Sequence, residues 1–412
     1  MTVSAVGAMS AVRTAGAPRT VRRSGFTIAA DGSYAACLAE AVAPEGGAGG
    51  GLLAERWTLA GPEPYAVPLP GPQPEEPGTQ VLPLADGRVL VRRRVADRHD
   101  LALLYPAGPG TGELPVGSLV GADVRLLPPA PDGAAYALAY DEDGDRTGVW
   151  RVHGMSEGVP QPVMAVPGRC SGGVWLDRAG RLLAVDSDQG GRTKAVAADL
   201  HTGRTSPLLQ ITEDSDDRLL LAEPDSGLLL LRSDATGETR LGWGVLGSGR
   251  PVRFPDALRV PGVLLSPVAA QPGQILMPEA AVVALRAEVP GGAASLALWR
   301  PGERRLHWRA SPPGWLGAAG MWLPGDELRL PYAEGDCHAG LAAYEPPAGW
   351  PEPGGSAAAG AVVRPQARAL PALPAPRALP ALPALAAPRA LPALPARREW
   401  CVLPLQQAPL AG

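Results

Sequence analysis

Seven two-residue turn signals recur along this chain at nearly even spacing. The steps between their first residues are 55, 46, 47, 47, 46 and 52 residues. The signals are Asp31-Gly32, Asp86-Gly87, Asp132-Gly133, Ala179-Gly180, Ser226-Gly227, Pro272-Gly273 and Pro324-Gly325. Glycine accepts positive φ without a Cβ clash, so such pairs favour tight hairpins. A repeat of this length built from short apolar strands is typical of a β-propeller blade.

A second series supports the same period. After each turn signal comes an apolar second strand, expected at 34–38, 89–91, 136–140, 182–185, 228–231, 275–277 and 328–330. A third strand follows, with an aromatic residue at a fixed place in six of the seven repeats. The series is Trp57, Tyr105, Trp150, Ala198, Trp243, Trp299 and Tyr344. We expect these large side chains to pack between neighbouring blades.

A fourth, outer strand completes each repeat. Segments such as 115–119, 162–166 and 207–211 begin at a proline, which lacks a ladder donor and therefore suits an edge strand. Four strands per unit and seven units predict an all-β fold. The predicted fold is a seven-bladed β-propeller of four-stranded antiparallel blades, with a disordered Pro/Leu-rich insertion in the last blade.

The repeat divides the chain into four parts. Residues 1–23 are expected to be a flexible N-terminal segment or a closing strand, and residues 24–350 the propeller blades. Residues 351–397 form a low-complexity insertion, in which Arg-Ala-Leu-Pro-Ala-Leu-Pro occurs three times and favours polyproline II. Residues 398–412 supply a closing outer strand and the C-terminus. Thr2–Met9 is the alternative outer strand for the last blade, and the sequence leaves both closures open.

Composition excludes several partner classes. The formal net charge is −4 and the pI about 5.8, so a concentrated cationic surface for nucleic acid is not expected. No stretch approaches the roughly 18 apolar residues of a membrane span. We expect a cytoplasmic, monomeric protein that uses neither nucleic acid nor membrane.

Catalytic motifs are not found in the sequence. There is no G-x-S-x-G nucleophile elbow and no phosphate loop, since Lys194 is the only lysine. The five histidines are spread over five repeats, and the four cysteines, Cys37, Cys170, Cys337 and Cys401, lie far apart. We expect separate buried thiols; a Cys37–Cys401 disulfide at the ring closure is the alternative. No catalytic residue and no cofactor are predicted.

Two acidic clusters remain as candidate sites. Asp141, Asp143 and Asp145 stand at the alternating positions of a calcium loop, but Arg146 and Val152 replace the glycine and the bidentate acid that such a loop needs. They are weak metal candidates, and a solvated hairpin loop is the favoured interpretation. The second cluster, Glu213–Asp217, is expected to be an exposed inter-blade loop, with a cation or an arginine-rich partner as the alternative.

The segment from Pro131-Asp132-Gly133 to Tyr140, followed by Gly148-Val149-Trp150, resembles the S-P-D-G repeat of TolB-like and related WD40-like propellers. The unit Asp177–Ala184 with Ala198–Arg204 is similar to the later half of that repeat. The resemblance covers about Gly25 to Leu405 and implies the fold. Such propellers also gate prolyl-oligopeptidase-like hydrolases; we do not expect that activity here, because the sequence shows no segment that resembles a hydrolase half.

The resemblance and the missing motifs favour a non-enzymatic propeller that binds a protein or peptide as a scaffold. The alternative is a small-molecule-binding, hydrolase or lyase propeller with its site at the channel mouth. That alternative needs ionisable groups from several blades to converge on the axis.

Overall fold

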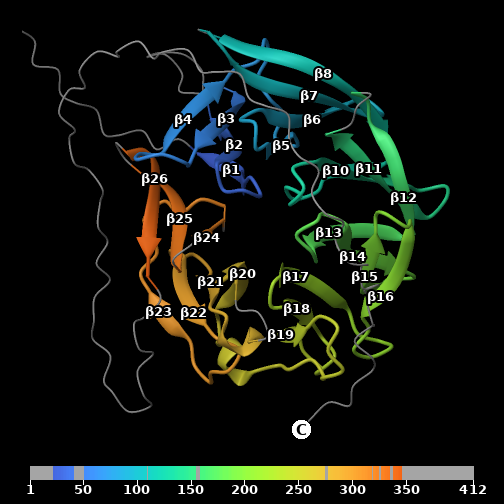
Figure 1. The fold of residues 1–412 in the computed structure, drawn as a ribbon, viewed down its shortest axis with the longest axis vertical. Helices are drawn as coiled ribbons and strands as arrows, with labels where there is room; N and C mark the ends of the chain where they lie inside the picture. The colour runs from blue at the N-terminus through green and yellow to red at the C-terminus, as the bar shows by residue number, and fades with distance from the viewer. Residues whose placement is uncertain are drawn as a thin grey trace, which may run out of the picture.

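The computed structural model describes residues 22–345 apart from 41–50, 109, 155–157, 274–276, 318, 324–325 and 335–336. In this part of the chain, the strands form seven antiparallel sheets that follow one another around a ring (Figure 1). The predicted seven-bladed β-propeller is therefore confirmed. Each sheet is one blade, numbered here in chain order.

Blades 1 to 4 each have four strands. In each blade the strands follow one another from the centre outward in sequence order. Blade 1 consists of β1 (Arg23–Ile28), β2 (Tyr34–Glu40), β3 (Leu52–Thr58) and β4 (Tyr65–Leu69), and blade 2 of β5 (Gln80–Pro83), β6 (Val89–Val95), β7 (Arg98–Ala107) and β8 (Gly110–Val120). Blade 3 consists of β9 (Asp123–Leu126), β10 (Ala135–Asp141), β11 (Arg146–His153) and β12 (Gln161–Pro167), and blade 4 of β13 (Arg169–Trp175), β14 (Leu182–Gln189), β15 (Arg192–Asp199) and β16 (Arg204–Leu209).

Blades 5 and 7 have three described strands, and blade 6 has four. Blade 5 consists of β17 (Asp217–Glu223), β18 (Leu228–Ser233) and β19 (Arg240–Val245) and is followed by the 3-10 helix η1 (Asp256–Leu258). Blade 6 consists of β20 (Leu264–Ala270), β21 (Val283–Glu288), β22 (Ser295–Trp299) and β23 (His307–Arg309), with η2 (Pro278–Ala280) before β21, and blade 7 of β24 (Met321–Leu323), β25 (Glu327–Glu334) and β26 (Cys337–Tyr344).

Blades 5 and 7 differ in what the structure describes at the place of the fourth, outer strand. In blade 5 a single bridge between Trp243 and Arg253 takes the place of a fourth strand. For blade 7, both predicted closing segments, 2–9 and 398–405, lie outside the described residues, as does the 351–397 insertion.

The turn signals have a local physical cause. In three of them the aspartate Oδ1 accepts the backbone N–H two residues later: Ser33 N at 3.1 Å, Arg88 N at 3.0 Å and Ala134 N at 3.0 Å. The following glycines have φ of +73° to +81°, which L side chains rarely adopt. The side chain and the glycine together fix the reversal from first to second strand.

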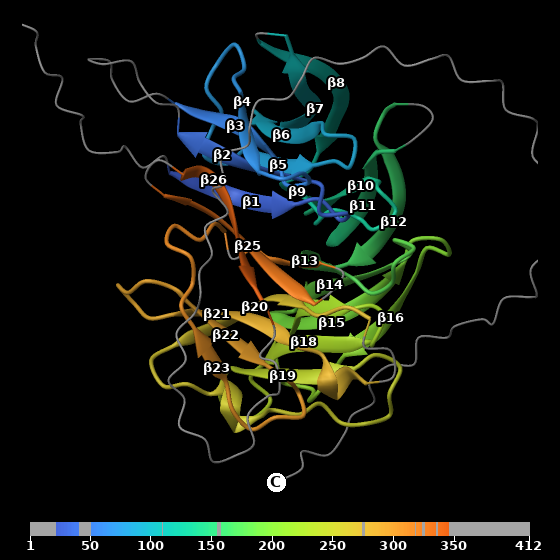
Figure 2. The same ribbon diagram turned by 60° about the vertical axis from the view of Figure 1, so that its left-hand side comes forward.

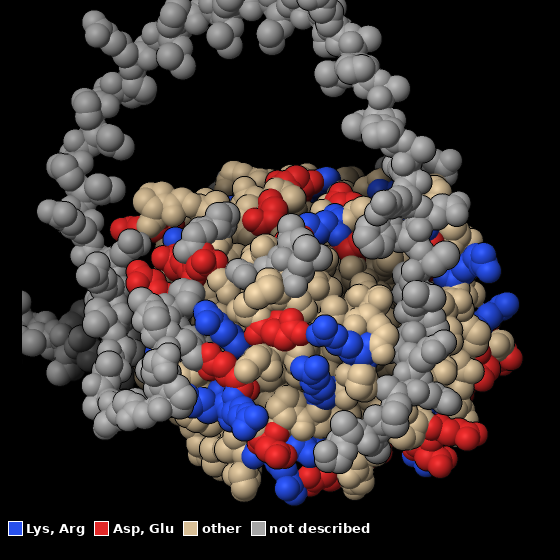
Figure 3. Space-filling model, turned by 60° about the horizontal axis from the view of Figure 1, so that its bottom comes forward, with Lys and Arg blue, Asp and Glu red and all other residues tan. Residues whose placement is uncertain are grey.

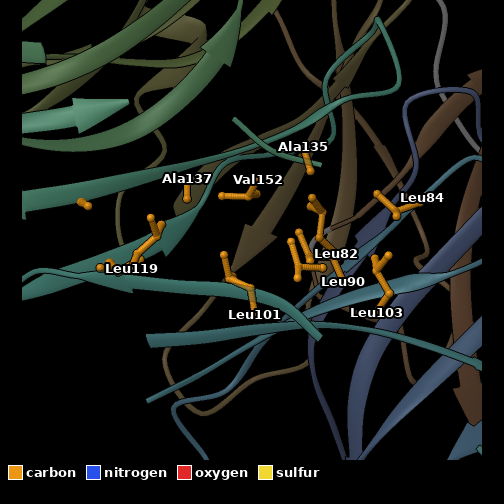
Figure 4. Close-up of a cluster of buried hydrophobic side chains, with 12 residues drawn as sticks. Leu82, Leu84, Leu90, Leu101, Leu103, Leu119, Ala135, Ala137 and Val152 are labelled. Carbon is orange, nitrogen blue, oxygen red and sulfur yellow. The ribbon is translucent and has the colours of Figure 1, made fainter. Parts of the chain in front are cut away.

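The core is divided between the blades. Seven clusters of buried hydrophobic side chains are found in the described residues, and each lies between two neighbouring blades. Figure 4 shows the one between blades 2 and 3, where leucines such as Leu90 and Leu101 face Ala137 and Val152. Second strands are buried on both faces, which explains continuous apolar runs such as 228–231.

The ring closes through packing of blade 7 on blade 1. Figures 1 and 2 both place β26 beside blade 1, and their shared cluster includes Phe26, Trp57 and Ala333. Within blade 1, next to this cluster, buried Glu55 accepts hydrogen bonds from Arg23 Nε at 2.6 Å and Trp57 Nε1 at 2.7 Å. These bonds satisfy a carboxylate that would otherwise be costly to bury.

Most predicted strands match the structure, and two predictions need correction. The second strand of blade 6 is β21, not 275–277, because the turn of that blade is lengthened by η2. All seven members of the aromatic series lie on third strands, and most are packed between blades. Tyr105 is the exception: its side chain is exposed on an overhanging hairpin.

The strand directions give the ring two faces. Inner strands begin on one face and turn into second strands on the other, so we name these the start face and the turn face. The turn face bears the six turn signals that the structure describes; the seventh, Pro324-Gly325, lies outside the described residues. The start face bears the hairpins between second and third strands and the connections that lead into each next blade.

Candidate functional site

Four arginines from four successive blades lie on the start face, three of them on inner strands. They are Arg94 at the end of β6, Arg125 on β9, Arg169 at the start of β13 and Arg218 on β17. We call this set the arginine arc. Arg94 and Arg169 are exposed, and Arg125 and Arg218 are partly exposed. The positions follow from topology, since inner strands begin, and second strands end, on the same face.

Arg125 and Arg169 share one carboxylate. Asp123 Oδ2 accepts Nη2 of Arg125 at 2.7 Å and Nη2 of Arg169 at 3.0 Å. Burial opposes ionisation, but these hydrogen bonds hold the pKa of Asp123 below its usual range. Among the described residues, the other guanidinium N–H groups of Arg125 and Arg169 find no acceptor. Each fork therefore keeps donors that face solvent.

Arg218 is bound by hydroxyl groups and a distant carboxylate. Its Nη1 donates to Ser171 Oγ at 3.2 Å and its Nη2 to Thr193 Oγ1 at 2.8 Å. The Asp186 carboxylate lies 3.9 Å away and accepts the backbone N–H of Leu219 at 3.0 Å. Burial raises the pKa of Asp186 to about 6, against the smaller opposing effects of that N–H and of Arg218. A shifted carboxyl near the axis is a feature of functional sites, although structural pairs also produce it.

Arg92 and His99 support the arc from below. Arg92 is buried and donates to Gln80 Oε1 and Gly78 O, and its Nη1 lies 3.0 Å from His99 Nδ1. Burial, together with Arg92 and Arg94, lowers the pKa of His99 and so favours its neutral form. Of these two buried residues, Arg92 is the one that adds positive charge next to the arc.

The second acidic cluster has a structural role. The 213–217 segment joins blades 4 and 5 as predicted, but the expectation of an exposed loop is wrong for Ser215 and Asp217, which are buried. Lys194 is its cation: Nζ lies within 3.2 Å of Thr212 O, Ser215 O, Ser215 Oγ and Asp217 Oδ2. The single lysine of the chain thus fills an oxygen-lined position that burial of Asp217 requires.

The first acidic cluster is a hairpin between β10 and β11, as predicted. Asp141 accepts Arg146 Nε at 3.2 Å and Gly144 N at 3.3 Å, and Asp145 accepts the Tyr140 hydroxyl at 3.1 Å. Asp143 is exposed. Within the described residues no group of three or more His, Cys, Asp or Glu has an arrangement that fits a metal ion. The metal candidates stay a prediction that no contact here supports.

The outer edge of blade 2 is a second unusual surface. β8 has 11 residues and is the longest described strand, and β7 has 10. Tyr105, Pro106 and Ala107 pair only with β8, because the β6 pairing of β7 begins at Leu104 (Figure 1). Leu114 (50%) and Val120 (78%) are exposed apolar residues on β8 itself, and Tyr105 (38%) on β7 and Val95 (42%) on β6 are exposed further inside the blade.

Thiols and histidines are dispersed. Cys37 and Cys170 are buried, Cys337 is partly buried, and Cys401 lies outside the described residues, so its pairing with Cys37 is not addressed. Burial and the nearby Glu55 raise the pKa of the Cys37 thiol, which disfavours the reactive thiolate. The histidines fall on five different blades.

Charge on the outside of the ring is mixed. Figure 3 shows arginine and acidic side chains interspersed on the side that it displays, not gathered into a patch of one sign. In the described residues, no helix is long and apolar enough to span a membrane.

Known proteins resemble this chain in fold only. No protein-family model and no curated protein matches the sequence. Solved structures similar to it include TolB from Acinetobacter baumannii, with 16% identity over 77% of this chain and 78% of that one and a TM-score of 0.40. A puromycin hydrolase is 18% identical over 80% of this chain, with a TM-score of 0.51.

A third similar structure is the β-propeller domain of the Trilobed protease from Pyrococcus furiosus. It is 10% identical, covers 79% of this chain and 93% of that one, and has a TM-score of 0.49. The match to the puromycin hydrolase spans 52% of that enzyme, about half its length. At these identities the likeness shows the propeller fold and leaves activity open.

Sequence reasoning missed the arginine arc and the overhanging hairpin. The arc draws one residue from each of four blades, so no local motif marks it. The hairpin had a signal, since Gly110-Thr111-Gly112 stands directly beyond Tyr105 in the aromatic series. The ring of Tyr105 lies over Gly112, where a Cβ would meet it at 2.4 Å.

Proposed function

We propose that this protein is a non-enzymatic β-propeller whose partner protein or peptide adds an extended segment to the outer edge of β8. The observation that carries the proposal is the length and apolar character of that edge. Outer strands are usually short or protected by charge, because an open edge invites pairing with other chains. The exposed Leu114 and Val120 instead favour a partner.

The chemistry of the edge fits strand addition. Backbone N–H and C=O groups of an outer strand give affinity to any extended segment, and side chains next to the edge select among partners. Pro115 lacks an N–H and Gly117 has φ of +141°, so the edge is interrupted near its middle. The partner would pair on either side of this interruption.

A photo-crosslinking experiment tests the proposal. A benzophenone side chain replaces Leu114 in one full-length variant and Trp308, exposed on the outer strand of blade 6, in a control variant. We expect distinct adducts from extracts of the source cells at position 114, which disappear when Val120→Lys is added. Identical adducts at both positions, or adducts insensitive to Val120→Lys, would reject the edge as the binding surface.

The alternative, a small-molecule or hydrolase/lyase site at the channel mouth, is supported by the placement of Asp186 beside Arg218 and Ser171. A screen of esters, amides and lactones tests it. Turnover by the native protein that is lost in Asp186→Asn would favour an enzyme. The cytoplasmic location and the monomeric state remain predictions.

A further inference from the structure

The arginine arc has more donors than its own acids use. Three carboxylates lie among the four arginines: Asp123 and Asp186 pair with members of the arc, and exposed Asp188 stands opposite Arg169 in the β13–β14 pairing. A positive excess of one charge remains when all three acids are ionised. Elsewhere on the ring the pairing varies: Arg181 faces Asp199 alone, whereas Arg93 and Arg178 each face two carboxylates. The positive excess of the arc stands in a chain whose net charge is −4.

The arc also shows how it would hold an anion. Asp123 Oδ2 already lies between Arg125 and Arg169, so two guanidinium groups from neighbouring blades converge on one carboxylate oxygen. Guanidinium is planar and pairs with carboxylates through two parallel hydrogen bonds. Arg169 also lies over the ring of Tyr140, with its Cζ 5.8 Å from the ring centroid.

Arg218 extends the same surface. Arg218 donates a hydrogen bond to Ser171, which is two residues after Arg169 on β13. Ser171 therefore connects the two arginines. Gly172, next to Ser171, is exposed, so backbone without a side chain borders the arginines there. The hydroxyl partners of Arg218 do not neutralise its charge, and the carboxylate of Asp186 lies 3.9 Å from its Nη1.

We propose that the arginine arc binds a carboxylate-bearing ligand between Arg125, Arg169 and Arg218 on the start face. The ligand is either a small polycarboxylic acid or an acidic stretch of a polypeptide, and both present the same group. The site is separate from the outer edge of blade 2. Acids at the rim, Asp141 and Asp216, are held by Arg146 Nε and by the N–H of Thr193.

Fluorescence anisotropy with fluorescein-labelled hexaglutamate tests this proposal on the full-length protein. We expect binding at about 50 mM salt that weakens strongly by about 300 mM, as screening of exposed charges requires. Arg169→Glu and Arg218→Glu should each weaken binding about tenfold or more, since charge-assisted hydrogen bonds are replaced by repulsion. Arg169→Lys, which keeps the charge but loses the fork, should fall between.

The control is Arg204→Glu, which makes the same change of charge at an exposed residue on the turn face. It should alter affinity less than about twofold. Melting curves confirm folding, and Arg169→Gln replaces Arg169→Glu if the latter is unstable. Citrate that displaces the peptide identifies a small acid as sufficient, whereas hexaglutamate binding without citrate competition identifies a polypeptide.

Two results would overturn the proposal: no binding of either hexaglutamate or citrate, or an equal loss in Arg204→Glu, which would mean that only net charge matters. The Leu114 and Val120 variants of the β8 edge serve as a further control. They should bind hexaglutamate as the native protein does, so failure of the edge proposal and failure of this one are distinguishable.

Discussion

The two faces of the ring use arginine in opposite ways. On the turn face, Arg178 of blade 4 donates to both oxygens of Asp225 in blade 5, at 2.5 and 2.6 Å. Asp225 Oδ2 in turn accepts the N–H of Gly273 in blade 6 at 3.1 Å. One arginine–aspartate pair thus links three blades, and its donors are used in holding the ring.

On the start face the arginines of the arc share acids and keep spare donors. The buried support there comes from other groups, chiefly Lys194 with Asp217 and the N–H of Leu219 on Asp186. The comparison teaches that exposed arginine can join blades on one face, whereas on the other face buried groups join blades 4 and 5 and the arginines keep donors available. Three stability measurements test this contrast between the two faces.

The largest effect is expected at Lys194. Lys194→Ala removes the ammonium from Asp217, which is completely buried, and an unpaired buried charge costs about 3–5 kcal/mol. Ser215 Oγ, Ser233 Oγ and Ile211 N still bind Asp217, so we expect about 3 kcal/mol, at the low end of that range. Urea unfolding measures it. Arg192→Ala, an exposed residue on the same strand, is the control, and equal losses would refute a buried ion pair.

Asp186 should give the next effect, with a distinct pH dependence. Its pKa is raised from 3.8 to about 6 in the folded protein, so it contributes stability below about pH 4 that is lost as pH rises through 6. Asp186→Asn keeps an acceptor for Leu219 N and cannot ionise. We expect the variant to match the native protein at pH 4 and to exceed it by about 2–3 kcal/mol at pH 8.

Exposed Asp188, two residues along the same strand, provides the control for that prediction. Asp188→Asn should leave the pH dependence of the unfolding free energy as it is in the native protein. The prediction is wrong if the native protein is more stable at pH 8 than Asp186→Asn. That result would mean that the attraction between the Asp186 carboxylate and Arg218 exceeds the penalty of burying the ionised carboxyl.

The repeat was predictable because its signals are local. Asp-Gly turns depend on a hydrogen bond between residues two positions apart in sequence. The burial of a strand appears in the sequence as an apolar run. Seven blades, the strand order and the third-strand aromatics follow from such signals. The second strand of blade 6 was mislocated because η2 lengthens its turn, and a local pattern offers no measure of an insertion.

The candidate surfaces were not predictable for a different reason. The arc depends on which residues stand on the inner strands of three blades and at the end of the second strand in a fourth, so its members are up to 124 residues apart in sequence, from Arg94 to Arg218. No local pattern marks Lys194, since only the fold brings it to the 212–217 loop. Tyr105 is exposed because β7 extends beyond the end of its pairing with β6. The even spacing of the aromatic residues gives no sign of this difference in strand length.

The smallest effect is expected on the turn face itself. Arg178→Ala removes the link from blade 4 to Asp225, but the Arg178 side chain is 59% exposed, so we expect a loss of only about 0.5–1 kcal/mol. The loss should shrink in 1 M salt, since exposed charges are screened. Arg181→Ala breaks a pair within blade 4 and is the matched control. If both variants lose the same stability and neither responds to salt, the pair does not join blades, and the contrast between the two faces fails with it.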